Sequence, residues 1–192
     1  MKRRMRIIAG ISWGVATALA VGLAIAHTAG LRLNLTHSAP IGLWHVRPVE
    51  PGTLARGQLV EICPPPAPVV QAMREHGYLS TGWIGRCEQA GVMALLKPVA
   101  AVAGDLVSIR QGVPAKVNGV PLVNTRANAG IPAWPDGDYI VSRGWVWVFS
   151  SYSTASFDSR YFGPVPAANV RGQATPIFIR GTAAMTNGAT AP

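Results

Sequence analysis

A single lysine stands in the apolar stretch "VMALLKPVAAV", residues 92–102, where an ammonium group is hard to solvate. The chain has only three lysines against fourteen arginines, so the choice of lysine at position 97 is unusual. A guanidinium keeps its charge, whereas burial lowers a lysine pKa from about 10.4 by up to about 3 to 5. Lys97 is therefore a candidate general base. The structural alternative is a lysine whose stem packs on apolar surface while its head reaches water.

A base needs a nucleophile, and the sequence offers Ser38 in "NLTHSAPIGLW", twelve residues after a long apolar segment. Serine is a weak nucleophile until a base takes its proton, so Ser38 and Lys97 would together suit a Ser/Lys hydrolase. A Ser/His/Asp triad with His37, His45 or His76 is the competing interpretation. His37 fits it poorly, because adjacent residues of an extended strand point to opposite faces.

The apolar segment, residues 7–26, holds twenty uncharged residues, enough for a helix of about 30 Å to cross a bilayer. The basic residues of segment 1–6 precede it, which predicts a cytoplasmic N-terminus and an external domain over residues 27–180. A cleaved secretory signal is the alternative, although its apolar region is usually only about 7 to 15 residues long. We expect an uncleaved membrane anchor, and a disordered tail over residues 181–192.

The composition agrees with a membrane segment and argues against nucleic-acid binding. Of the 192 residues, 49% are hydrophobic and only 13% are charged. The mean hydropathy is positive, at +0.26. The formal charge is +9, but beyond the N-terminal cluster the arginines are scattered singly, without an aromatic-basic platform. We therefore expect no nucleic-acid partner.

Short segments rich in Val and Ile recur between Gly and Pro, which is typical of an antiparallel β domain. Examples are "GQLVEI", "VMALLKPVAAV", "GDLVSIR", "AKVNGVPLV", "DYIVSRGWVWVFS" and "ATPIFIR". The segment "APVVQAMREHGYL" has helical spacing and lies between the two cysteines, Cys63 and Cys87. A disulfide between them would tether residues 63–87 as an insertion. His76 lies in the same stretch, but without CxxC or HxxxH spacing we expect neither a metal nor a cofactor.

Three motifs occur in a fixed order behind the apolar segment. They are the pattern TxSxPxG over residues 36–42, then "LLKPVAAVAGD", then "SFDSRYFGPV". Together they resemble the type I signal peptidases, and most closely their conjugative-transfer branch, the TraF-type pilin-maturation peptidases. The resemblance covers most of residues 1–165. It implies a mainly β fold: an antiparallel signal-peptidase-like β domain with a small disulfide-tethered helical insertion, behind one N-terminal transmembrane helix.

The resemblance also implies roles for individual residues. Ser38 would attack the scissile carbonyl and Lys97 would take its proton. The Ser38 backbone N–H and the Thr36 hydroxyl would form the oxyanion hole, and Ser156 would hold the lysine amine by a hydrogen bond.

The aspartate and arginine of "SFDSR" complete the implied site. Asp158 and Arg160 would form a supporting ion pair, and the branch implies that Asp158 is also needed for activity. The sequence departs from the general family at Ala39, where methionine is usual, and at Gln58, where aspartate is usual. It also lacks the usual "GDN" before its "DSR". These departures favour the specialised branch.

The function that follows is a membrane-anchored serine endopeptidase that trims a propilin for a conjugative pilus, with or without cyclisation of the pilin. Its partners would be the polypeptide substrate, the inner membrane and other conjugation-apparatus proteins. Two alternatives stay open: a general signal peptidase that cleaves exported preproteins, and a non-catalytic periplasmic assembly or scaffold protein. The latter predicts that Ser38→Ala and Lys97→Met preserve function.

Overall fold

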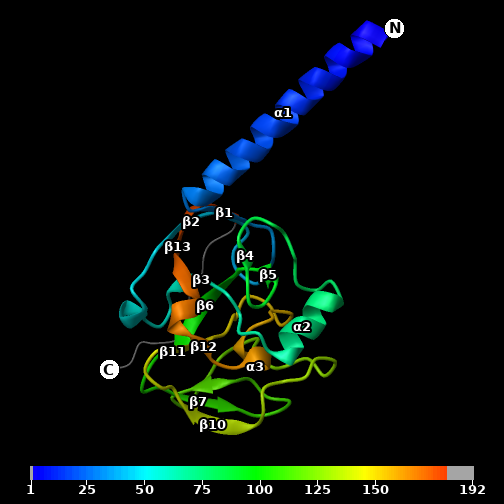
Figure 1. Ribbon diagram of the computed structural model, residues 1–192. Coiled ribbons are helices and arrows are strands. Elements are labelled where there is room, and N and C mark those ends of the chain that lie inside the picture. The colour runs from blue at the N-terminus through cyan, green and yellow to red at the C-terminus, as the bar shows by residue number, and fades with distance from the viewer. Residues whose placement is uncertain (1, 181–192) are drawn as a thin grey trace.

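The computed structural model describes residues 2–180, so the expected tail at 181–192 lies outside the described residues. The first element is one long helix, α1 (Lys2–Thr28), which projects away from the β domain (Figure 1). Its part Met5–Thr28 is long and apolar enough to cross a membrane, a test that a signal sequence also passes. The helix starts before the expected segment at 7–26, because lysine, arginine and methionine are good helix formers.

The rest of the described chain is mainly β structure. The strands are β1 (Leu31–Asn34), β2 (Gly42–Arg47), β3 (Leu59–Ile62), β4 (Arg86–Cys87), β5 (Val92–Met93), β6 (Leu95–Ala101), β7 (Leu106–Ile109), β8 (Lys116–Val117), β9 (Val120–Pro121), β10 (Gly137–Ile140), β11 (Trp145–Val148), β12 (Val165–Pro166) and β13 (Val170–Ile179). The helices after α1 are α2 (Pro68–Glu75) and α3 (Ser159–Phe162), with 3-10 turns at η1 (Pro51–Thr53) and η2 (Ala167–Asn169).

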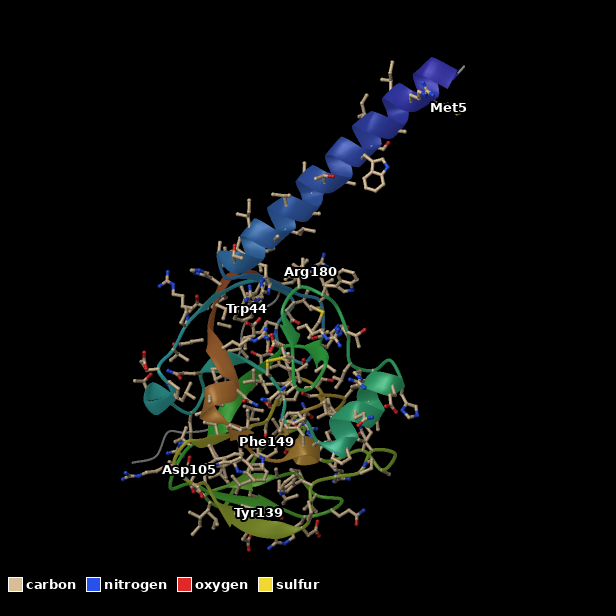
Figure 2. All side chains as sticks on the ribbon, in the orientation of Figure 1. Met5, Trp44, Asp105, Tyr139, Phe149 and Arg180 are labelled. Carbon is tan, nitrogen blue, oxygen red and sulfur yellow. A yellow bond between two sulfur atoms is a disulfide. The ribbon has the colours of Figure 1, made fainter. Side chains whose placement is uncertain are left out.

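All strand pairs are antiparallel, as the sequence predicts. The main sheet has seven strands in the order β1-β2-β13-β3-β6-β11-β12, and β6 lies between β3 and β11. A four-stranded sheet, β10-β7-β8-β9, forms the end of the domain opposite α1 (Figure 1). In Figure 2, Tyr139 marks that far end, whereas Trp44 lies close to the base of α1.

The hairpin of β1 and β2 carries the serine motif in its connection. Asn34 pairs with Gly42 at the end of the ladder, so residues 35–41 form the loop. Gly42 closes the motif with φ +153°, and an added Cβ would lie 2.1 Å from the Phe178 carbonyl oxygen of β13. Glycine is therefore required where β2 passes β13 at the foot of the serine loop.

The expected helical insertion is present and is tethered as predicted. Cys63 and Cys87 form a disulfide, with their Cα atoms 5.5 Å apart. Figure 2 shows this bond in yellow inside the domain. Within the insertion, α2 begins at a proline and buries Val70 against the main core. The insertion is thus held both by a covalent bond and by burial of an apolar side chain.

Three expected strand segments are interrupted in the structure. Residues 92–102 divide into β5 and β6 at Ala94, residues 115–123 into β8 and β9 at Asn118 and Gly119, and residues 138–150 into β10 and β11 around Gly144. Gly144 has φ +80°, which suits a turn and not a strand. Lys97 therefore lies on β6, which belongs to the seven-stranded sheet, whereas β5 pairs with β4.

Candidate active site

Lys97 lies on β6, directly opposite Val60 of β3. Along β6 the buried positions alternate, and Lys97 shares its side of the strand with Val99 and Ala101. Its side chain is only 2% exposed, so the interpretation as a lysine that reaches water is wrong. The ammonium group is buried on the face where the strand otherwise places apolar residues.

Burial sets the charge state of this amine. Desolvation lowers the pKa of Lys97 from 10.5 to about 8, while the charge of Asp158 raises it and the charge of Arg160 lowers it. The Lys97 Nζ donates a hydrogen bond of 2.9 Å to Ser156 Oγ, which fixes the direction of the amine. A neutral fraction is therefore available close to neutral pH.

The serine loop is organised by the amide of Asn34, which is 8% exposed. Its Nδ2 lies 3.0 Å from the carbonyl oxygens of Thr36, Ala39 and Pro40, and its Oδ1 accepts from the Thr36 N–H and hydroxyl. Trp44 adds an indole hydrogen bond of 3.1 Å to the Pro40 carbonyl. One side chain thus determines the path of the loop on both sides of Ser38.

The hydroxyls of Thr36 and Ser38 lie 3.2 Å apart. Asn34 Oδ1 can only accept, so the Thr36 proton is directed to it over 2.8 Å. Ser38 Oγ is then the donor to Thr36. The Ser38 N–H has no hydrogen-bond partner within residues 2–180, so it is free to bind an oxyanion without rearrangement. Thr36 would first have to turn its proton away from Asn34.

Asp158 and Arg160 form a fully buried ion pair, with exposures of 0% and 1%. Two bonds join them, Nε to Oδ1 at 2.8 Å and Nη2 to Oδ2 at 2.9 Å. Arg160 also donates to the carbonyls of Asn124, Thr154 and Ser150. A buried ion pair is tolerated when additional hydrogen bonds occupy its remaining donors and acceptors, as these bonds of Arg160 do. Within the described part of the chain, the Asp158 carboxylate has no hydrogen bond to Lys97 or Ser38.

A second buried serine connects the ion pair to the serine loop. Ser150 is 0% exposed, its N–H donates to Asp158 Oδ2 at 3.0 Å, and its carbonyl accepts from Arg160 Nη2 at 3.0 Å. The Ser150 hydroxyl donates to the Ser38 carbonyl oxygen at 2.5 Å. The ion pair is therefore linked to the serine loop through one intermediate residue.

The serine loop and the strand that carries Lys97 both line one groove of about 1130 Å³. Ser38, Lys97 and Ser156 all line it, although no direct hydrogen bond joins Lys97 Nζ to Ser38 Oγ among the described residues. Its walls are mostly apolar and come from far-apart segments, including Leu23 of α1, Leu33 of β1, Leu79 of the insertion and Leu95 of β6. Its volume suits a segment of extended peptide.

The insertion supplies one wall of this groove. Its segment 78–86 contributes Tyr78 and Ile84 to the lining. The Tyr78 hydroxyl donates to the Ala155 carbonyl, and its ring packs edge-on against Phe157, with centroids 6.3 Å apart. Arg171 of β13 binds the same segment through the carbonyls of residues 85 and 86. The wall is therefore fixed to the stretch that carries Ser156.

The competing chemistries find less support. His37 lies in a turn, so the expectation that His37 and Ser38 point to opposite faces of an extended strand is wrong. Within residues 2–180, however, no hydrogen bond joins a histidine to Ser38. In the same part of the chain, no three His, Cys, Asp or Glu side chains gather in a way that could hold a metal ion.

The sequence comparisons define the class of protein. The family described as signal peptidase, peptidase S26, matches residues 4–179. The chain belongs to this family of peptidases.

Its curated relatives are conjugal transfer proteins. The chain is 39% identical over 167 residues to "Probable conjugal transfer protein TraF" of Sinorhizobium fredii, covering 84% of this chain and 85% of that one. It is 37% identical over 167 residues to "Conjugal transfer protein TraF" of Agrobacterium tumefaciens, covering 86% and 92%. It is 32% identical over 185 residues to "Plasmid transfer protein TraF" of Escherichia coli, covering 90% and 98%.

A solved structure is also similar, at a greater distance. It is the crystal structure of a signal peptidase I from Enterococcus faecalis, with 19% identity and a TM-score of 0.37 over 64% of this chain and 97% of that one. The likeness is too remote to transfer the role of any residue.

Two residues of the site were missed by sequence reasoning. Asn34 stands four positions before Ser38, and its preference for local bonds to the backbone was the available signal. Ser150 has no such signal, because it reaches Ser38 across 112 positions of sequence. Of the predicted site residues, Thr36, Ser38, Lys97 and Ser156 line the groove, whereas Asp158 and Arg160 do not line it and are linked to Ser38 through Ser150.

Proposed function

We propose that this chain is a membrane-anchored serine endopeptidase in which Ser38 is the nucleophile and Lys97 the general base. The observation that carries the proposal is the burial of Lys97 in the groove that also exposes Ser38, with its pKa lowered to about 8. A neutral amine can accept the Ser38 proton, and hydrogen bonds that are long in a free enzyme often tighten when substrate binds.

The reaction then runs in two steps. Ser38 Oγ bonds to the scissile carbonyl carbon while its proton passes to Lys97, and the oxyanion is stabilised by the free Ser38 N–H and, after it turns, by the Thr36 hydroxyl. The tetrahedral intermediate collapses to an ester and the leaving amine takes the proton back from Lys97. Water or a substrate amine next attacks the ester and restores Ser38.

We propose a propilin of a conjugative pilus as the substrate. The names of the relatives, which are conjugal and plasmid transfer proteins, support this class over exported preproteins in general. The apolar groove suits a short hydrophobic polypeptide that binds in extended form beside the strands. If the pilin's own N-terminal amine attacks the ester, its large effective concentration favours a cyclic product over hydrolysis.

We also propose that α1 stays attached and holds the β domain on the periplasmic side of the inner membrane. The basic residues before its apolar part favour this orientation, and the disulfide suits an oxidising compartment.

The intact mass of the pilin precursor encoded nearest this gene tests the proposal. The precursor is co-expressed with the wild-type chain or with Lys97→Met. Shortening by the wild type alone supports the Ser/Lys pair, and a product one water lighter than the linear trimmed peptide indicates cyclisation. Equal shortening by both chains excludes Lys97 as the base. An unchanged precursor with the wild type rejects this substrate, and exported preproteins are tested next.

A further inference from the structure

We propose that Ser150 is a positioning residue that clamps the nucleophile, resting on the proposed function above. Its hydroxyl holds the Ser38 carbonyl, and the Asp158–Arg160 pair holds Ser150. The pair thereby acts on Ser38 without touching its hydroxyl.

The backbone of Ser150 is fixed from both sides. Its N–H is bound to the carboxylate of Asp158, and its C=O is bound to the guanidinium of Arg160, each at 3.0 Å. Both partners are fully buried and bonded to each other. Hydrogen bonds to charged groups are stronger than neutral ones, so the position of Ser150 is set by the strongest polar contacts near the site.

The side chain of Ser150 transmits that position. Its hydroxyl donates to the Ser38 carbonyl at 2.5 Å and accepts from the Tyr152 N–H at 3.3 Å. The single hydroxyl proton is therefore used in the hydrogen bond to Ser38. Segment 150–156 also carries Ser156, the partner of the Lys97 amine. Ser150 therefore links the loop of the nucleophile to the stretch that orients the base.

The hydrogen bond from Ser150 to the Ser38 carbonyl fixes the direction of the Ser38 side chain. A fixed carbonyl determines the ψ angle of Ser38, and with it where the Cα–Cβ bond and the Oγ atom point. Asn34 holds the carbonyls on either side of Ser38 but not that of Ser38 itself. A displacement of about 1 Å in a catalytic group costs on the order of 100-fold in rate. Loss of the clamp should therefore slow acylation.

The test compares Ser150→Ala with the matched control Ser159→Ala in the full-length chain. Ser159 is also 0% exposed and its hydroxyl accepts a hydrogen bond of 2.9 Å from the Val148 N–H, but within residues 2–180 it has no hydrogen bond to the serine loop. The readout is single-turnover cleavage of the pilin precursor. We expect a rate constant about 10- to 100-fold lower for Ser150→Ala, with an unchanged amplitude.

The amplitude separates positioning from stability. A variant that merely misfolds in part lowers the fraction of chains that react, and leaves the rate constant of the remainder unchanged. The pH at which the rate is half-maximal should stay the same in Ser150→Ala, because the surroundings of the Lys97 amine are intact. Equal rate constants in the wild type and both variants overturn the proposal.

A second measurement does not depend on cleavage. Amide hydrogen exchange of residues 35–41 should be faster in Ser150→Ala than in the wild type, and unchanged in Ser159→Ala. If the wild type fails to cleave any precursor, the proposed peptidase function falls, and exchange alone decides whether the clamp exists. Identical exchange in all three chains rejects the clamp even if the wild type is active.

Discussion

In the proposed mechanism, the buried amine of Lys97 makes the rate of cleavage depend on pH in a defined direction. Its pKa is lowered to about 8, and only the neutral form accepts the Ser38 proton. The rate should therefore rise as pH increases through about 8 and level off above it. A pH–rate profile of precursor cleavage under single turnover measures this. A rate that still climbs at about pH 10, the pKa of a solvated lysine, contradicts a desolvated base.

The same burial has a cost in stability. Because the folded-state pKa of Lys97 lies below its unfolded value, protonation favours the unfolded chain. The resulting penalty is fully present below about pH 8 and is lost as pH rises toward the unfolded value of 10.5. A pKa change of this size corresponds to about 3 kcal/mol.

Lys97→Met should therefore stabilise the protein while abolishing cleavage. Methionine has a similar length and no charge to desolvate, so we expect the free energy of unfolding at pH 7 to rise by up to about 3 kcal/mol. Denaturant unfolding at pH 7 and pH 10 measures the effect, which should shrink at the higher pH. The exposed residue Lys116 offers a control, since Lys116→Met removes a charge that is already in water. A loss of stability at pH 7 argues against a desolvation penalty.

At the scale of elements, the site depends on one strand, β6, and on the serine loop, and sequence patterns describe the two unequally. The lysine strand could be predicted, because its Val-rich alternation and its flanking turn residues are local signals. The serine loop could be located from its motif. The alternation "LRLNL" over residues 31–35 is a local signal for strand β1, but the hairpin that β1 forms with β2 was not predicted. Asn34 gives the loop its shape through contacts within six residues, and Ser150 through a contact across 112.

The disulfide that holds the insertion can be removed by substitution without changing the rest of the insertion. With Cys63 and Cys87 both replaced by serine, the free energy of unfolding should fall by about 2–4 kcal/mol, the usual value for a loop of this length. The wall formed by segment 78–86 should loosen, so KM for the precursor should rise while kcat changes less. Chemical unfolding and steady-state cleavage measure the two effects.

A substitution at Met93, an exposed residue that lines the same groove, provides the control for that experiment. Met93→Leu keeps the apolar lining with the disulfide intact, and should leave the stability nearly unchanged. A double-serine chain with wild-type KM shows that the tether does not position the wall.

At the scale of the whole molecule, the motifs contain Ser38, Lys97 and Ser156, which all line one groove, but their order does not predict the surface that they form. The groove is lined by α1, β1, the insertion, β6 and the stretch around Ser156, segments spread over more than a hundred residues. No local pattern reports such a surface, because it arises from the sheet order β1-β2-β13-β3-β6, in which β13 returns from the end of the described chain. In the four-stranded sheet, β7, β8 and β9 pair locally, with a turn at Asn118 and Gly119 between β8 and β9, and it is β10 that returns from farther along the chain to pair with β7.

The orientation of the whole chain can be tested through its disulfide. Leu23 and Ala26 of α1 line the groove, so the site should lie close to the membrane surface if α1 spans the bilayer. On the periplasmic side, Cys63 and Cys87 become oxidised, whereas in the cytoplasm they stay reduced. Intact mass without reductant should show the full-length chain lighter by two hydrogens, and a chain lacking residues 2–26 with both thiols free. Restoring export of the shortened chain with a cleavable secretory signal should restore the bond. Free thiols in the full-length chain place the domain in the cytoplasm, and the proposed periplasmic peptidase then has the wrong topology.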